Sequence, residues 1–202
     1  MKISVAGVIL AAGRGKRFGG KVRALLKINR QTFLEKIIRN FRRTKVNPII
    51  LVLGYKNKRI QKYLHKEGLL DLVKVVVNPE YQKEQILSLQ LAIKKCPENF
   101  SGILFTPVDY PLVKLSTYQR LLKEWRKTPE KICLPSYRYR KGHPALFPRW
   151  AAEELLRKKI SGGARAILKK YPDEIKYVIV KDSGILRDFD TISDWEEYLK
   201  SL

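Results

Sequence analysis

The sequence predicts an α/β fold with three layers, α/β/α, in which helices cover both faces of a mainly parallel β-sheet. Segments of strand length and segments of helical period alternate along all 202 residues. The strand-like segments at 4–12 (SVAGVILAA) and 48–54 (PIILVLG) are apolar almost throughout, which is typical of strands buried on both faces. This alternation favours parallel strands that are joined by crossover helices.

The first half of the chain is expected to hold three strands, each followed by a helix. In TFLEKIIRNFRRT, apolar residues recur at positions 33, 34, 37, 38 and 41, the spacing of one helix face. Gly54 ends the second strand, Gly68 stops the second helix, and Pro97 lies just past the third. The expected strands are 4–12, 48–54 and 72–78, and the expected helices are 32–44, 57–68 and 84–96.

The second half continues the alternation with shorter segments. GILFTPVD at 102–109 is a fourth buried strand, and Ser193 is expected to be the N-cap of the closing helix. GHPALF at 142–147 is expected to form one further short strand. The remaining expected strands are 131–137 and 175–182, and the helices are 116–127, 150–159, 163–171 and 193–202.

Length and composition indicate a single domain, residues 1–202, with enough apolar residues for a real core. Cys96 and Cys133 fit no zinc or redox pattern and are expected to be reduced, buried thiols. His65 and His143 lie far apart and form no metal cluster. No apolar run is long enough to cross a membrane and no signal peptide is recognisable, so we expect a cytoplasmic protein.

The charge of the chain is unusually positive. It has 42 Lys and Arg against 19 Asp and Glu, a formal net charge of +23. Such a field attracts polyanions, including nucleotides and nucleic acid. The lysines are scattered over nearly every amphipathic segment, however, and scattered cations favour a solvated surface over a dedicated nucleic-acid site. We therefore expect small phosphorylated ligands and no nucleic-acid partner.

LAAGRGKRFGGKVRALL (10–26) is the most informative segment, because four glycines and five cations follow a buried strand. Glycines let the backbone approach a ligand closely, so that its N–H groups can wrap a triphosphate. Ligands of parallel sheets bind at the carboxyl ends of the strands, where the loops 11–23 and 106–113 both lie. The cations that would neutralise the phosphates are Arg14, Lys16, Arg17, Lys21 and Arg23.

Three other interpretations fit this loop less well. The dinucleotide fingerprint GxGxxG fails because Gly13, Gly15 and Gly19 give a spacing that is one residue too long. The P-loop pattern fits as far as Lys21, but Val22 stands where a Ser or Thr must bind magnesium. A solvated glycine turn would leave the density of cations unexplained.

Six segments together resemble the MobA-like NTP transferases. The glycine loop is similar to the family signature LAAGxSxRMGxxKxLL, and the other five segments follow in the family's order. They are NPEYQKEQILSL (78–89), PVDYPLV (107–113), GHPALF (142–147), GGARAIL (162–168) and LRDFDTISDW (186–195).

The resemblance implies a Rossmann-like fold of the nucleotide-diphospho-sugar transferase type and transfer of a nucleotide to a phosphorylated acceptor. LAAG together with GHP looks most like the molybdenum-cofactor cytidylyltransferase branch, since the guanylyltransferase branch usually has LAGG. This branch implies CTP, Mg²⁺, molybdopterin as acceptor, and contact with an enzyme that accepts the cofactor. The methyl of Ala12 would also crowd a purine and suit a pyrimidine.

Two acidic segments are expected to bind the metal. Asp109 follows a buried strand opposite the cationic loop, a place suited to Mg²⁺. Asp188 and Asp190 share one face of an extended segment, and the resemblance makes Asp190 the second ligand. The alternatives are that Asp109 caps a turn and that the other two cap the helix that follows.

The resemblance also implies roles for other residues. His143 and Gly142 would bind the acceptor, with the imidazole kept neutral by nearby cations, although His143 could instead be packed in a turn. Asn78 could equally form a strand-ending turn, and Ser88 could be a helix-surface serine. Arg17, Arg23 and Lys21 are the expected catalytic cations, and the expected nucleotide-binding residues are Leu10, Ala11, Ala12, Gly13, Arg14, Gly15, Asn78, Ser88 and Pro107.

The expected reaction is in-line attack by an acceptor phosphate oxygen on the α-phosphorus of the NTP, with release of pyrophosphate. Arg23 or Lys21 replaces the family lysine, and Glu84 replaces a family glycine near the acceptor path. These departures leave other NTPs and other phosphorylated acceptors open. A non-catalytic nucleotide- or RNA-binding protein is a further alternative, but such a binder gains nothing from Asp109 and Asp190 in a cationic cleft.

Overall fold

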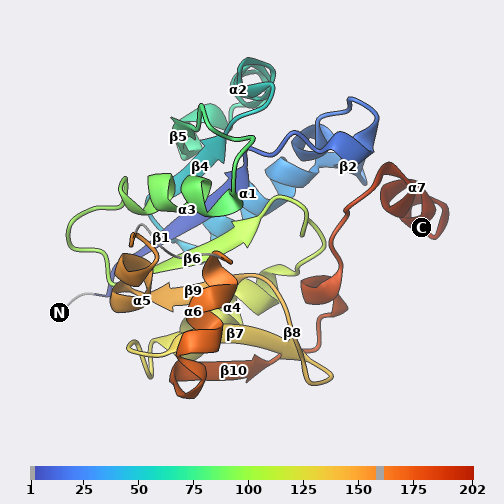
Figure 1. The fold of residues 1–202 in the computed structure, drawn as a ribbon. Helices are drawn as coiled ribbons and strands as arrows, with labels where there is room; N and C mark the ends of the chain where they lie inside the picture. Colours follow the sequence, from blue (N-terminus) through green and yellow to red (C-terminus); the bar gives the residue numbers. More distant parts are fainter. Residues whose placement is uncertain (1–2, 158–161) are drawn as a thin grey trace.

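One large mixed sheet organises the computed structural model, which describes residues 3–157 and 162–202 (Figure 1). Its strand order is β10-β7-β9-β6-β1-β4-β5, and β8 pairs with β7. A separate two-stranded hairpin, β2 (Lys27–Ile28) with β3 (Gln31–Thr32), was not expected from the sequence. The strands of the large sheet are β1 (Val5–Ala11), β4 (Ile49–Leu53), β5 (Lys74–Val77), β6 (Gly102–Pro107), β7 (Ile132–Tyr137), β8 (Arg140–Lys141), β9 (Ala145–Pro148) and β10 (Ile175–Ile179).

The sheet is mainly parallel, as the sequence predicts. Strand β1 pairs in parallel with β4 and β6, β4 with β5, and β10 with β7, whereas β9 runs antiparallel between β6 and β7. The chain first builds outward from β1 through β4 and β5, and then crosses to the other side of β1 to form β6. The strand order therefore reverses between β1 and β6, and ligands of open α/β sheets bind at such a point.

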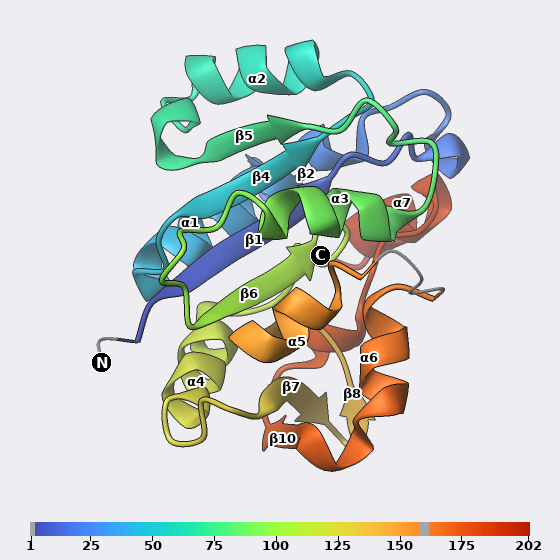
Figure 2. The ribbon, with the colours of Figure 1, turned by 60° about the vertical axis from the view of Figure 1, so that its left-hand side comes forward.

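Helices cover both faces of the sheet and complete three layers (Figure 2). One face carries α1, α2 and α4, and the opposite face carries α3, α5 and α6. Strand β1 supplies side chains to both cores alternately, with Ile9 on the first face and Val8 and Leu10 on the second. The helices are α1 (Phe33–Thr44), α2 (Asn57–Lys66), α3 (Gln85–Ile93), α4 (Leu115–Trp125), α5 (Arg149–Glu154), α6 (Ala164–Lys170) and α7 (Ile192–Lys200).

Helix α1 shows how local sequence and packing cooperate. The hydroxyl of Thr32 caps its first turn by accepting a hydrogen bond from the backbone N–H of Glu35 at 3.1 Å. The helix lies close to β1 because position 7 is glycine. A Cβ built on Gly7 would stand 2.5 Å from the ring of Phe41, so any larger residue would push α1 off the sheet.

Each strand and helix expected from the sequence is present, with small differences at the ends. The closing helix is capped by Thr191 and not by Ser193, because Thr191 and Asp194 form a reciprocal capping box. Strand β10 ends at Ile179, three residues before the expected end, and α5 ends at Glu154. The end of the expected helix 150–159 falls partly on residues 158–161, which lie outside the described part of the chain.

The cysteines follow the expectation only in part. Cys133 is buried, but Cys96 is only half-buried, because it lies at the end of α3 where the chain turns toward solvent. Trp125 is fully buried in the core, whereas Trp150 and Trp195 are half-buried and donate their indole N–H groups to backbone carbonyls. In the described part of the chain, no helix combines the length and apolar character needed to cross a bilayer.

Candidate active site

The glycine loop follows the carboxyl end of β1 as an irregular turn that two buried side chains hold in place. Phe18 is fully buried, and Val22 is buried with 7% of its surface exposed. Gly15, Gly19 and Gly20 have φ values of 58°, 54° and 79°, which favour glycine. Gly19, Gly20 and Lys21 between the two buried residues are exposed, and so are Arg14, Lys16 and Arg17 before them.

The structure of the glycine loop excludes the dinucleotide fingerprint and the P-loop. Two short 3₁₀ turns, η1 (Lys16–Phe18) and η2 (Arg23–Leu25), follow β1, and the first α-helix begins only at Phe33. A dinucleotide fingerprint or a P-loop needs an α-helix that starts at the loop and aims its N-terminus at the phosphates. The loop therefore has neither arrangement, and its role in wrapping a triphosphate stays a prediction.

Arg23 brings the two acidic segments together. Its Nη1 atom lies 3.0 Å from Oδ2 of Asp109 and 3.8 Å from Oδ1 of Asp190, although 81 residues separate these carboxylates in the chain. The same Nη1 donates a hydrogen bond to the carbonyl of Phe189 at 3.3 Å. The guanidinium also stacks over the ring of Phe18, 5.6 Å from its centroid, which restricts its orientation.

The buried carboxylate of Asp109 has one oxygen without a partner. Its side chain is 14% exposed, and its Oδ1 atom is buried without a hydrogen-bond partner. Burial raises the pKa of this carboxyl, and the guanidinium of Arg23 opposes that rise. An unpartnered, buried carboxylate oxygen is a costly feature unless something binds it, and a hard divalent cation suits such an oxygen.

Asp190 is the more exposed member of the pair, at 47%. Its carboxylate lies 3.4 Å from Arg17 in addition to its contact with Arg23. In residues 3–157 and 162–202, no cluster of three or more His, Cys, Asp or Glu could hold a metal by itself. Two carboxylates fit a divalent cation that completes its coordination with phosphate and water, as Mg²⁺ commonly does.

Two other loop cations, Lys21 and Arg14, lie over aromatic rings. The ammonium of Lys21 lies over the ring of Trp195, 5.2 Å from its centroid, and Arg14 lies over Tyr55. Of the two residues that could replace the family lysine, Arg23 is thus the one that reaches the carboxylates. That placement favours Arg23 over Lys21, and the catalytic roles of Arg17, Arg23 and Lys21 stay predictions.

Asp182, which was not predicted from the sequence, connects the two acidic segments through hydrogen bonds. Asp182 is 3% exposed, and its Oδ2 accepts hydrogen bonds from the backbone N–H of Lys114 at 2.9 Å and from the hydroxyl of Thr117 at 2.6 Å. Its Oδ1 accepts one from the N–H of Gly184. Asp182 therefore fixes the segment that leads to Asp190 against the segment that follows Asp109.

The turn formed by Gly142, His143 and Pro144 packs against the segment 182–190. The backbone N–H of His143 donates to the carbonyl of Ile185 at 3.1 Å. A Cβ on Gly142 would come within 2.0 Å of that carbonyl oxygen, so only glycine fits. Ile185 belongs to η5 (Ser183–Leu186), which continues directly to Asp190. The turn expected to bind the acceptor is thus coupled to the expected metal site.

Asn78 and Ser88 are occupied by the fold itself. The side-chain amide of Asn78 donates to the hydroxyl of Ser88 at 2.9 Å, and its oxygen accepts from the N–H of Glu80 at 2.8 Å. The exposed fractions of these two side chains are 1% and 4%. Ser88 is therefore not a helix-surface serine, and the turn interpretation of Asn78 is correct. Direct contact of either with a nucleotide stays a prediction.

The strand ends beside the loop are also packed. Leu10, Ala11 and Ala12 each have an exposed fraction of 5%, whereas Gly13 and Arg14 are exposed. The carbonyl of Ala12 accepts a hydrogen bond from the N–H of Tyr55 at 2.9 Å. Ligand contacts at positions 10–12 would therefore involve backbone and the edges of small side chains.

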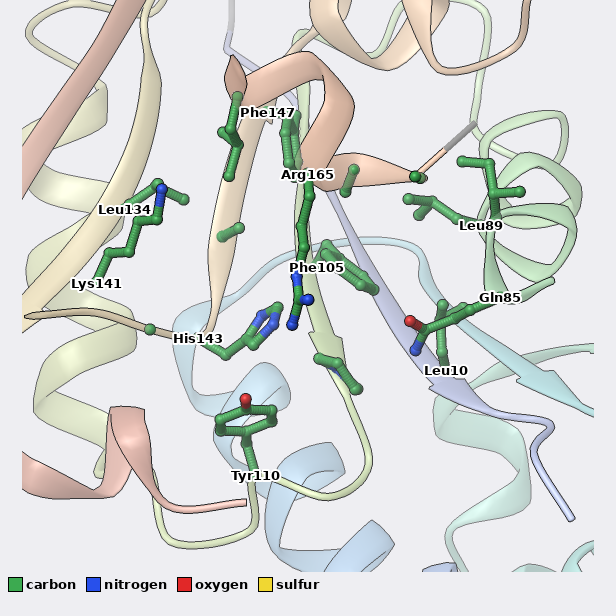
Figure 3. Close-up of a pocket in the computed structure, with 18 of the residues that line it drawn as sticks. Leu10, Gln85, Leu89, Phe105, Tyr110, Leu134, Lys141, His143, Phe147 and Arg165 are labelled. Carbon is green, nitrogen blue, oxygen red and sulfur yellow. The ribbon is translucent and has the colours of Figure 1, made fainter. Parts of the chain in front are cut away.

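A cavity of about 700 Å³ is lined by Tyr110, the residue that follows Asp109 (Figure 3). Its lining includes Leu10 and Pro107 from the expected nucleotide-binding residues, and Gly142 and His143 from the expected acceptor-binding residues. Leu10 and His143 lie on opposite sides of the cavity (Figure 3). Leu89, Phe105, Leu134 and Phe147 make much of the lining apolar. The cavity is thus placed between the residues expected to bind the nucleotide and those expected to bind the acceptor.

Several polar residues of the cavity had no predicted role. The guanidinium of Arg165 reaches in from α6 toward the ring of His143, and Tyr110 lies beneath that ring with 4.6 Å between centroids (Figure 3). Lys141, Glu84 and Gln85 complete the polar lining. Arg165 lies in the GGARAIL segment and Tyr110 follows Asp109, so both had a sequence signal, but nothing in the sequence showed that they meet.

The pKa of His143 is lowered mainly by burial, and the nearby cations that the sequence suggested contribute less. Burial lowers its pKa from 6.5 to about 4, and the charge of Arg165 adds to this effect. Its Nδ1 atom is buried and has no hydrogen-bond partner. A neutral imidazole in this position can offer a hydrogen bond to a ligand in the cavity, although the packing against Tyr110 and Phe105 also makes it part of a rigid turn.

Comparison with known proteins identifies the family. The family model described as the MobA-like NTP transferase domain matches residues 7–175. The chain belongs to this family. It is therefore a nucleotidyltransferase, and the three-layer fold of the nucleotide-diphospho-sugar transferase type is confirmed.

Relatives of this MobA-like NTP transferase carry more than one name. The chain is 27% identical over 197 residues to nicotine blue oxidoreductase of Paenarthrobacter nicotinovorans, with 93% of each covered. It is 25% identical over 197 residues to molybdenum cofactor guanylyltransferase of Haemophilus influenzae, with 96% of this chain and 97% of the relative covered.

A solved structure is also similar along nearly the whole chain. Rv0371c of Mycobacterium tuberculosis superposes with a TM-score of 0.81 and 27% identity, covering 98% of this chain and 100% of that one. Its complex with manganese superposes with a TM-score of 0.77 and 26% identity, over the same shares of the two chains.

The lowered pKa of His143 leads to a prediction for the MobA-like chain. The folded protein resists protonating this imidazole, so stability should be fully present above pH 6.5 and fall by up to about 3 kcal/mol as the pH drops toward 4. Urea unfolding at a series of pH values measures this. His143→Gln should flatten the dependence over that range, whereas His65→Gln, at an exposed position, should leave it unchanged.

Proposed function

We propose that the protein transfers the nucleoside monophosphate of an NTP to a phosphate oxygen of a small phosphorylated acceptor and releases pyrophosphate. One observation carries the proposal: Arg23 of the glycine loop contacts the carboxylates of Asp109, which follows β6, and of Asp190. Tyr110, next to Asp109, lines the cavity of about 700 Å³. Phosphoryl transfer needs such positioning and charge neutralisation more than it needs a protein nucleophile.

Each part of the site has a role in this proposal. The glycine loop holds the triphosphate with its backbone N–H groups, and Arg17 and Arg23 face the charge that develops on the leaving pyrophosphate. Asp109 and Asp190 would hold Mg²⁺, which supplies charge neutralisation at the reacting phosphates when it is bound. The manganese complex of the Mycobacterium tuberculosis relative supports a divalent ion.

Molybdopterin is the acceptor that we propose. The apolar walls of the cavity, among them Leu89, Phe105 and Phe147, suit a flat ring system better than they suit a sugar, which would need many hydrogen bonds. Arg165 and Lys141 provide cations for the acceptor's phosphate. The name of the Haemophilus influenzae relative supports the same acceptor.

We propose CTP as the nucleotide, on the basis of LAAG and GHP, and GTP as the second candidate. GTP is favoured by the name of the Haemophilus influenzae guanylyltransferase. The steric argument for CTP is weak, because the methyl of Ala12 is 5% exposed and packs mostly in the core. A base pocket discriminates mainly through hydrogen bonds that the wrong base leaves unpaired.

Two other functions receive less support. A dinucleotide-dependent oxidoreductase, which the name of the Paenarthrobacter nicotinovorans relative raises, would need a helix N-terminus at the pyrophosphate, and the glycine loop does not lead into one. In a protein that only binds polyanions, the carboxylates of Asp109 and Asp190 would repel the ligand and weaken its binding. Such a function would also leave the buried Oδ1 of Asp109 without a partner.

The test is release of pyrophosphate from each of the four NTPs with Mg²⁺, with and without molybdopterin. We expect release only with the acceptor present, and a higher kcat/KM with CTP than with GTP. Ala12→Gly should narrow that difference if the methyl contributes to it. A preference for GTP would replace the cytidylyl proposal, and the absence of release from every NTP would overturn nucleotidyl transfer to this acceptor.

A further inference from the structure

A second hollow, of about 820 Å³, lies on the α1 side of the molecule. It is bounded by α1, the segment 111–115 that leads into α4, and Tyr198 of α7. It shares no lining residue with the cavity beside the carboxylates. We call it the cationic groove, and its lining residues are Gln31, Lys36, Arg39, Asn40, Arg42, Arg43, Leu72, Pro111, Leu112, Val113, Lys114, Leu115 and Tyr198.

The charge of this groove has one sign and is mostly uncompensated. Five of its lining residues are cations and none is acidic. Arg39 pairs with Glu35 at 2.9 Å, whereas the other four make no ion pair within the described residues. Part of the excess positive charge therefore lies in a concave surface, where low-dielectric walls concentrate the field.

Helix α1 holds these cations in a fixed pattern. Lys36, Arg39 and Arg43 are spaced i, i+3 and i+7 along it, so they line one face. The opposite face of α1 is fully buried against the sheet, which prevents the helix from turning away. Asn40 joins the helix to the far wall by donating to the carbonyl of Val113 at 3.1 Å. The groove is thus a built surface and not a chance grouping of mobile side chains.

The remaining lining of the groove is largely apolar. Leu72, Leu112, Val113 and Leu115 contribute aliphatic surface between the cations, together with Pro111. A ligand that bears only charge would leave this surface in water. A chain segment that alternates carboxylates with aliphatic side chains would satisfy both the cations and the apolar surface.

Single-stranded nucleic acid fits this lining less well. Binding of bases requires exposed aromatic rings on which they stack. Tyr198 is the aromatic residue of the groove, and its ring is already packed edge-on against Phe189 at 5.5 Å and covered by Arg187 at 4.7 Å. The lining therefore favours a polypeptide over RNA.

We propose that the cationic groove docks an acidic, partly aliphatic segment of a partner protein. This proposal goes beyond nucleotidyl transfer and does not depend on it, because the groove and the active-site cavity have separate linings. The segment 109–115 connects them: Asp109 faces the active site at one end, and Lys114 lines the groove at the other. A docked partner would therefore lie near the site without blocking it.

The probe is a fluorescein-labelled peptide of about 16 residues composed of glutamate and leucine, long enough to span the groove in helical form. Fluorescence anisotropy at physiological ionic strength should show saturable binding to the full-length protein. A peptide with glutamine in place of each glutamate should bind at least tenfold more weakly, because the charges are lost while the aliphatic side chains remain.

Charge reversal in two places decides whether the groove is the site. Arg42→Glu with Arg43→Glu should weaken peptide binding at least tenfold. Arg59→Glu with Lys62→Glu changes the net charge equally on α2, where both residues are exposed and line neither hollow, and should leave binding near the wild-type value. Thermal melts should show that both double variants are folded, and their pyrophosphate release should be unchanged.

Three results would overturn the proposal. One is the absence of saturable peptide binding. Another is an equal loss in the two double variants, which would show that only net charge matters. The third comes from a uridine 16-mer: if it binds more tightly than the peptide and only the groove variant weakens it, the groove is a nucleic-acid site.

Discussion

Replacing Asp109 with asparagine should lower metal-dependent turnover by about a thousandfold or more and leave the fold intact. The side chain is 14% exposed, its Oδ1 is buried without a partner, and its Oδ2 meets Arg23 at 3.0 Å. Asparagine keeps the shape but removes the charge that a divalent cation requires. Because burial raises the pKa of Asp109, losing its charge should not destabilise the protein strongly.

The matched control is Asp188→Asn. Asp188 is exposed in the same acidic segment and makes no ion pair within the described residues. Its loss should leave turnover close to the wild-type rate, and Asp190→Asn should fall between the two. Steady-state kinetics at several Mg²⁺ concentrations, with thermal melts of each variant, separate a catalytic loss from unfolding.

Binding of Mn²⁺, followed by electron paramagnetic resonance, tests the same assignment without turnover. Asp109→Asn should weaken Mn²⁺ binding. In the wild type, Mn²⁺ binding should weaken as the pH falls, because a carboxyl of raised pKa gains its proton at a higher pH than usual. Full activity and unchanged Mn²⁺ binding in Asp109→Asn would show that the metal is held elsewhere.

The order and type of the regular elements could be read from the sequence because each depends on local pattern. The apolar runs at β1, β4 and β6 are buried on both faces, as an all-apolar strand must be. The errors lie at ends where two residues compete for one role. Thr191 displaces Ser193 as the N-cap because Asp194 returns a hydrogen bond to it, a reciprocity that spacing alone does not rank.

The site was predictable only in part, because its residues meet through topology. Asp109 and Asp190 were found because each stands at a recognisable place in the chain. Asp182 was missed, since its partners Lys114 and Thr117 lie 68 and 65 residues away. Arg165 was missed in the same way: its role depends on α6 lying beside the GHP turn, and no local pattern specifies that neighbour.

Arg23→Ala should have two opposite effects, on turnover and on metal binding. The guanidinium serves as the counter-ion of Asp109 and Asp190 at 3.0 Å and 3.8 Å, so its removal should tighten Mn²⁺ binding to the nucleotide-free protein by about tenfold. Turnover should nevertheless fall by about a hundredfold, because a cation that faces developing phosphate charge acts mainly in the transition state. The binding measurement belongs at mildly alkaline pH, where the unpaired carboxylate is ionised.

Two further variants make this result specific. Arg23→Lys keeps a charge but loses the planar guanidinium, whose Nη1 contacts both carboxylates and whose plane lies over Phe18, so it should be intermediate in both measurements. Lys21→Ala is the control, because this ammonium lies over Trp195 at 5.2 Å and makes no ion pair with Asp109 or Asp190. Single-turnover rates and Mn²⁺ titrations of all three variants give the answer. If Lys21→Ala lowers the single-turnover rate and Arg23→Ala does not, then Lys21 is the catalytic cation and Arg23 only neutralises the carboxylates.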